Sequence, residues 1–205
     1  MKFTTVKKLY RGEFQYNIVL RFSFSYMFQG INKGNYTELL HAIMDSDLKY
    51  LTTDEKEAMK FIPDLYNCIM NMENFTTRYS WPRVIFYTNN YSDIQNIAAL
   101  VPDKNIISIG IPPDGLEKGM VYMPATPFDY RVTIRKICKL NQEFVEWARG
   151  NKNIKLQQNT EYMLEHGAEF YSSSGSQLYV KGDRNLFFVQ FHLGNTNLTV
   201  DRILN

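Results

Sequence analysis

Alternating apolar and polar side chains make the segment 14–28 the most regular part of the chain. Its even-numbered positions are all aromatic or aliphatic: Phe14, Tyr16, Ile18, Leu20, Phe22, Phe24, Tyr26 and Phe28. A period of two is typical of a strand with one buried face. The segment is far longer than the usual strand of about 5–6 residues. We therefore expect either a bulge within it or a long ribbon that another part of the protein covers.

Helical spacing of apolar residues follows in the region 35–73. Capping boxes that begin at Asn35 and at Thr52 predict two helix starts. Pro63 interrupts the second apolar stripe. That helix must therefore kink at Pro63 or restart with Pro63 in its first turn.

Residues 83–111 have the pattern of a strand, a helix and a second strand. The apolar run 84–87 comes first, and Ser92 opens a helix that Pro102 ends. A second apolar run covers 105–111. Because both runs are almost continuously apolar, we expect a parallel pair of strands that is buried on both faces.

The last third of the chain predicts one strand, two helices and a hairpin. The strand covers 130–137, and the helices cover 142–149 and 160–166, each followed by a glycine where a left-handed cap is expected. We interpret 177–193 as a β-hairpin with a two-residue turn that begins at Gly182.

These elements together predict one α+β domain over residues 1–205. Its mixed β-sheet would contain the long N-terminal amphipathic strand, with a helical segment packed against the sheet and a β-hairpin at the C-terminal end. A subdivision near 75–82 is the alternative. No internal repeat stands out. A chain of 205 residues can bury a core that needs neither disulfides nor a metal.

Composition restricts the chemistry further. The two cysteines, Cys68 and Cys138, have no Cys or His neighbour at metal-binding spacing, so we expect no metal site and no disulfide framework. We also expect no cofactor. No apolar run approaches the ~20 residues of a membrane-spanning helix, and the first residues lack the apolar core of a signal peptide. We therefore expect a cytoplasmic protein that does not contact a membrane.

No recognisable catalytic constellation is present. The three histidines, His41, His166 and His192, lie in no local signature of a nucleophile and its base. The turn after Phe86 contains no glycine, which argues against a phosphate-binding loop. We expect binding rather than catalysis, and an active site assembled from distant residues is the alternative.

Basic and aromatic residues gather in the C-terminal half. The net charge is only +2, but residues 131–155 hold seven cations against two acids. The segment 184–191 matches the RNA-recognition consensus in part, although the order of elements is wrong for that module. If the strands share a sheet, one face would present the candidate nucleic-acid contacts Arg131, Arg135, Tyr179, Lys181, Arg184 and Phe188. Such a face can stack bases and hold phosphates. The alternative is that a helix of the same domain covers it.

Four short stretches resemble uncharacterised proteins of tailed bacteriophages. They are Lys7-Lys8-Leu9-Tyr10-Arg11, Phe128-Asp129-Tyr130-Arg131-Val132, Phe144-Val145-Glu146-Trp147 and Leu178-Tyr179-Val180-Lys181. The resemblance carries no catalytic residue and implies an accessory or virion role in a bacterial host. We therefore expect a non-catalytic phage accessory protein that binds nucleic acid. The alternative is a virion assembly or protein-interaction component, which would join another phage or host protein through the edge of the long N-terminal strand.

Overall fold

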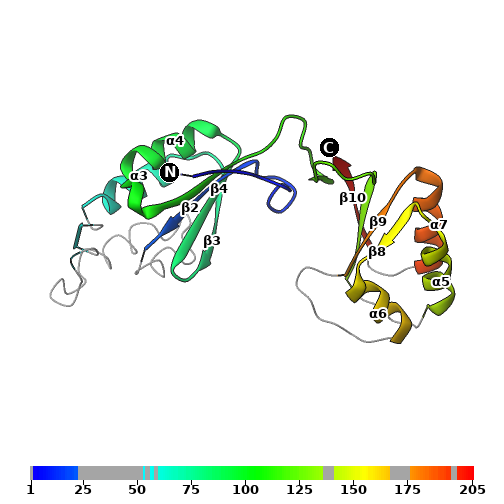
Figure 1. The fold of residues 1–205 in the computed structure, drawn as a ribbon. Coiled ribbons are helices and arrows are strands. Elements are labelled where there is room, and N and C mark those ends of the chain that lie inside the picture. The colour runs from blue at the N-terminus through cyan, green and yellow to red at the C-terminus, as the bar shows by residue number, and fades with distance from the viewer. Residues whose placement is uncertain are drawn as a thin grey trace. The chain divides into compact units, whose positions relative to one another are not determined.

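The chain forms two compact units, Met1–Asp114 (unit 1) and Gly115–Asn205 (unit 2). The computed structural model describes residues 2–22, 53, 56–57, 60–135, 141–166, 176–194 and 198–205. Each unit has its own five-stranded sheet and its own apolar core (Figure 1). The α+β class is confirmed, but the single mixed sheet is wrong, because two sheets form. The unit boundary follows Asp114, whereas residues 75–82 lie inside unit 1.

Unit 1 is a mixed sheet with two described α-helices. Its elements are β1 (Phe3–Thr5), β2 (Tyr16–Arg21), α3 (Ile62–Met70), β3 (Phe75–Ser80), β4 (Arg83–Thr88), α4 (Tyr91–Leu100), a short 3-10 helix (Asp103–Asn105) and β5 (Ile106–Ile111). The strand order is β1-β5-β2-β4-β3. Strand β1 runs parallel to β5, and the other neighbouring pairs are antiparallel.

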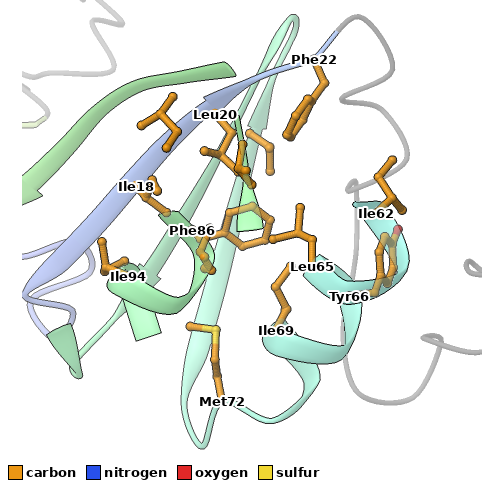
Figure 2. Close-up of a cluster of buried hydrophobic side chains, with 14 of the residues drawn as sticks. Ile18, Leu20, Phe22, Ile62, Leu65, Tyr66, Ile69, Met72, Phe86 and Ile94 are labelled. Atoms are coloured by element: carbon orange, nitrogen blue, oxygen red, sulfur yellow. The ribbon is translucent and has the colours of Figure 1, made fainter. Parts of the chain in front are cut away.

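The core of unit 1 lies between the sheet and the two helices. Phe86 of β4 is fully buried beside Ile18 of β2, and Leu65 and Ile69 of α3 approach it from the helix layer (Figure 2). Helix α4 adds Ile94 and other apolar residues to the same cluster. Burial of these side chains on one face of each element is what fixes the helices against the sheet.

The alternation predicted for the N-terminal strand holds wherever the structure describes it. Phe14, Ile18, Leu20 and Phe22 are buried, and Tyr16 is half-buried against the core. The predicted bulge has a counterpart between Val19 and Leu20, where the register with β5 shifts. Described strand β2 is only six residues long, however, so no long strand is shown. It lies between β4 and β5, which occupy both of its edges. Residues 24–28 lie outside the described part.

The predicted helix starts have different outcomes. Helix α3 begins at Ile62 with Pro63 in its first turn, so the restart at the proline is confirmed. The helices expected to begin at Asn35 and Thr52 start outside the described residues. Helix α4 begins earlier than its predicted cap at Ser92, because the Asn90 side chain accepts a hydrogen bond from the Ser92 backbone N–H.

The parallel pair expected in 83–111 is wrong in one respect. The strand, helix and strand form as predicted, but β4 and β5 are not neighbours because β2 lies between them. Strand pairing across a distant part of the chain cannot be read from a local apolar pattern.

Unit 2 contains a second mixed sheet and three described helices. Its elements are β6 (Met120–Tyr122), β7 (Tyr130–Ile134), α5 (Gln142–Gly150), β8 (Ile154–Leu156), α6 (Gln158–His166), β9 (Ser176–Val180), α7 (Asp183–Leu193) and β10 (Leu198–Leu204). The strand order is β6-β10-β7-β9-β8. Strand β6 runs parallel to β10, and the other neighbouring pairs are antiparallel.

The C-terminal hairpin is wrong. Strand β9 ends at Val180, and the residues expected to return as a second strand form helix α7 instead. Leu186, Val189 and Leu193 recur at helical spacing and pack against or within the core of unit 2. Gly182, expected in a hairpin turn, has a φ of +81° at the helix N-cap. A short apolar run fits both periods, and packing decided between them.

Predictions for the rest of unit 2 are closer to the structure. Strand β7 and helices α5 and α6 occur where the pattern places them. Gly150 belongs to helix α5, whose cap is Asn151, so the predicted left-handed cap at Gly150 is wrong. Gly167 lies outside the described residues.

The two units repeat one topology. After its first strand, each has the described succession strand, helix, strand, strand, helix, strand, with unit 2 carrying the additional helix α6 between β8 and β9. This is the succession of the split βαβ, ferredoxin-like motif. In both units the first strand adds to the sheet parallel to the last one. Sequence patterning had shown no repeat.

Strand registers reveal which residues of the two units correspond. Phe-x-Tyr-x-Ile-x-Leu-Arg at 14–21 aligns with Phe-x-Tyr-x-Val-x-Ile-Arg at 128–135. Ile18 pairs with Phe86 in unit 1 as Val132 pairs with Leu178 in unit 2. From these partners onward the helices align without a gap as far as the first residues of the last strands, where Ile106 pairs with Leu20 as Leu198 pairs with Ile134. The apolar residues Ile94, Ile97, Val101 and Ile106 correspond to Leu186, Val189, Leu193 and Leu198.

Candidate nucleic-acid interface

The sheet of unit 2 has one face that its described helices do not cover. Helices α5, α6 and α7 all contribute to the core that includes Val132, Leu178 and Ile154. Because side chains alternate along a strand, Arg131 and Tyr179 lie on the opposite face. We call this opposite side the open face; it is buried at Asp201, half-buried at Tyr179 and exposed at Lys155. The alternative that a helix of the same unit covers it does not apply to the described helices.

A cross-strand row of acidic, basic and aromatic side chains crosses the open face. The register pairs Asp201 with Arg131, Arg131 with Tyr179, and Tyr179 with Lys155. Side chains at such paired positions are close enough to interact. Strands β10, β7, β9 and β8 therefore bring residues that are distant in sequence into one line.

Arg131 is held by a buried ion pair. Its Nη2 lies 2.8 Å from Oδ2 of Asp201, and the two side chains are 17% and 2% exposed. Its Nε is buried with no hydrogen-bond acceptor among the described residues. The guanidinium thus compensates a carboxylate inside unit 2, which makes Arg131 a structural residue rather than a free phosphate contact.

Tyr179 is half-buried at the centre of the row. Its ring centroid lies 6.0 Å from that of Phe128, and its hydroxyl accepts a hydrogen bond from Nε2 of Gln157 at 3.3 Å. The same hydroxyl donates to Oε1 of Gln177 at 3.4 Å. Two glutamines and a second ring therefore orient the tyrosine at the surface.

Three exposed cations accompany Tyr179. Lys155 is its cross-strand neighbour on β8, Lys181 follows the end of β9, and Arg135 follows the end of β7. None of the ion pairs within the described parts of the chain involves any of the three. Because β7 and β9 are antiparallel, Lys181 and Arg135 follow opposite ends of the paired strands.

Arg184 and Phe188 do not lie on the open face. Both lie on α7, in the helix layer of unit 2, with the Arg184 guanidinium 5.9 Å from the centroid of the Phe188 ring. The six predicted contacts therefore form two groups, with four residues on or beside the strands and two on the helix. Sequence reasoning assigned the latter two to a strand because it read α7 as part of a hairpin.

Residues missed as sequence candidates include Lys155 and Gln157. Lys155 belonged to the basic stretch, but the strand that carries it was not predicted. Only the register between β8 and β9 shows that it lies beside Tyr179. A three-residue strand leaves too short an alternation to detect in a sequence.

Unit 1 carries a tyrosine at the corresponding position, and its side chain is buried. Tyr87 corresponds to Tyr179, is only 8% exposed, and stacks on Tyr10 with ring centroids 3.8 Å apart. Burial raises the pKa of Tyr87, as does Tyr10, and Arg78 opposes the rise. Unit 2 is therefore the one whose tyrosine retains a partly accessible ring.

A polar hollow of about 370 Å³ lies at the start of α4 in unit 1. Several groups that line it already bond to one another. The Thr88 hydroxyl donates to Oδ2 of Asp93 at 2.7 Å, and Oδ1 of Asn89 accepts from the Gln15 backbone N–H at 3.1 Å. These bonds stabilise the turn between β4 and α4.

Within the described ranges, no three or more His, Cys, Asp or Glu side chains gather as metal ligands. No helix that the structure describes is long and apolar enough to span a bilayer.

Comparisons of the chain with family models, curated proteins and solved structures give no significant match.

Proposed function

We propose that the protein binds single-stranded nucleic acid without catalysis, through the open face of unit 2. The observation that carries this proposal is the position of Tyr179 beside Lys155, with Lys181 and Arg135 following the neighbouring strand ends. An aromatic ring offers a stacking surface for any base, and lysine and arginine neutralise phosphates. The central strands of a split βαβ sheet are also where RNA-recognition modules present their stacking aromatics.

The proposed contact set differs from the one expected from sequence. It contains Tyr179, Lys155, Lys181 and Arg135, and it omits Arg131 because Asp201 already engages that guanidinium. Fold alone does not establish a function, so these side chains, rather than the topology, support the proposal. On the resemblance to tailed-bacteriophage proteins, we propose an accessory role in the bacterial host.

The proposal is tested with labelled oligonucleotides short enough to occupy one protomer. Fluorescence anisotropy at low and moderate salt compares oligo-dT, oligo-U and a duplex. We expect Tyr179→Leu to weaken single-strand binding by about 1–3 kcal/mol per lost stack. We expect Lys155→Ala to reduce the slope of log affinity against log salt by about 0.7.

Arg184→Ala is the matched control, because it removes a positive charge from the helix layer of the same unit. It should leave both affinity and salt slope unchanged. Absence of single-strand binding at low salt, or equal loss in Tyr179→Leu and Arg184→Ala, would reject the open face as the site.

A further inference from the structure

Helix α7 exposes three phenylalanines, Phe187, Phe188 and Phe191, which we call the aromatic ridge. Their side chains are 62%, 36% and 72% exposed. The Phe187 ring lies 6.4 Å from that of Phe191 and 5.9 Å from that of Phe188, between ring centroids. Phe188 in turn contacts Trp147 of α5 at 6.1 Å. Contiguous exposed rings of this kind are typical of an interaction surface.

The fold itself does not require this ridge. Helix α4 of unit 1 has the same place in the repeated topology and carries Gln95, Asn96 and Ala99 where α7 carries its phenylalanines. Those three residues are exposed too. The buried stripe is apolar in both helices, so the difference is confined to the outward positions. Helix α7 of unit 2 therefore has aromatic residues where helix α4 of unit 1 has polar or small ones.

Charges flank the ridge at its two ends. Helix α5 lies antiparallel beside α7, because Nδ2 of Asn141 donates to the His192 carbonyl at 2.9 Å and Nδ2 of Asn151 donates to Oδ1 of Asn185 at 3.0 Å (Figure 1). Arg184 thus lies at the N-terminal end of α7. Glu143, one turn before Trp147 on α5, belongs to the other end.

We propose that the aromatic ridge is the contact surface for a second copy of this chain, with the two α7 helices packed antiparallel across a two-fold axis. A two-fold interface is self-complementary, so each residue pair occurs twice. The antiparallel arrangement brings Arg184 of each copy toward Glu143 of the other. It also opposes the dipoles of the two helices favourably. The charge layout therefore selects a second copy as the occupant.

The first experiment measures mass against concentration by sedimentation equilibrium. We expect twice the monomer mass at micromolar protein. The variant Phe187→Gln/Phe188→Asn/Phe191→Ala, which copies the residues of α4, should be monomeric over the same range. Phe191→Ala alone, at the most exposed position, should weaken self-association at least tenfold while leaving the circular dichroism spectrum unchanged.

Tyr162→Ala is the control, because Tyr162 is an exposed aromatic residue of α6 in the same unit, 52% exposed. It should leave self-association unchanged. A wild-type chain that stays monomeric, or a dimer that the triple variant does not dissociate, would overturn the proposal.

The second experiment tests the antiparallel arrangement by charge reversal. Arg184→Glu and Glu143→Arg should each weaken the dimer several-fold, since each creates two like-charge contacts. The double variant should recover most of the wild-type affinity. Failure of the double variant to recover would contradict the proposed arrangement of the two copies, even if the ridge is buried in a dimer.

Discussion

Removal of Arg131 should destabilise unit 2 strongly, because it takes the ion-pair partner away from a carboxylate that is almost fully buried. The Asp201 side chain is 2% exposed and lies 2.8 Å from the guanidinium. At an effective dielectric constant near 20, two unit charges at this separation attract by roughly 6 kcal/mol. Desolvation offsets part of that attraction in the intact pair. Breaking such a pair from one side typically costs about 3–5 kcal/mol, and we expect Arg131→Ala to fall in that range.

Truncation of Asp201 should lower the free energy of unfolding less than truncation of Arg131 does. Arg131 is 17% exposed and has a long side chain that can turn toward solvent once its partner is gone. We therefore expect Asp201→Ala to lose about 1–3 kcal/mol. The double variant should lose less than the two single losses added, by about 1–3 kcal/mol, which is the coupling between the two residues.

The two tryptophans allow this measurement in one unit at a time. Trp81 belongs to unit 1 and Trp147 to unit 2. In a Trp81→Phe background, Trp147 fluorescence during urea denaturation reports the unfolding of unit 2. With an m value of about 2 kcal/mol/M, the Arg131→Ala midpoint should fall by roughly 1.5–2.5 M. A loss below about 1 kcal/mol, or additive single effects, would refute the buried-pair argument; Lys155→Ala serves as the exposed control.

Two further predictions concern unit 1. A Cβ at Gly110 would lie 2.4–2.8 Å from the Asn17 side chain, so Gly110→Ala should destabilise the protein by about 1–3 kcal/mol. Adding Asn17→Ala should recover much of that loss in thermal unfolding, and a harmless Gly110→Ala would contradict the close approach. Burial, assisted by the charge of Asp93, raises the pKa of Cys68, so less thiolate is present at a given pH. In a Cys138→Ser background, the rate of Cys68 alkylation should therefore reach its midpoint at a higher pH than the rate for a free thiol does. A midpoint at or below that of the free thiol would contradict the prediction.

Local patterning predicted the elements whose buried stripes are long enough to define one period. The alternation around Ile18 and Leu20 predicted the buried face of β2, and the spacing of Ile94 and Ile97 predicted α4. Helix α7 was misassigned because Leu186–Phe191 is almost entirely apolar, which leaves no polar side to distinguish helix from strand.

Features that depend on residues far apart in the chain were harder to predict from the sequence. Alternation correctly put Arg131 and Tyr179 on the same face, but it could not reveal the partner of Arg131, which lies 70 positions away. The repeat was hidden for a related reason. Corresponding core positions exchange Ile, Val, Leu and Phe, so side-chain volume and burial are kept although the amino-acid types differ. It became visible only through the strand registers, which tie Ile18 to Phe86 and Val132 to Leu178.

The place of β5 in its sheet has a consequence for synthesis on the ribosome. Strand β5 lies between β1 and β2, and its register pairs Leu20 with Ile106. At a translation rate of about 5–20 residues per second, β2 must wait several seconds for that neighbour to emerge. During this interval the edge of β2 that later receives β5 is without its partner, and nascent strands with an open edge are prone to mispairing. For unit 1, the demand for chaperones during translation should therefore last until residue 111 leaves the exit tunnel.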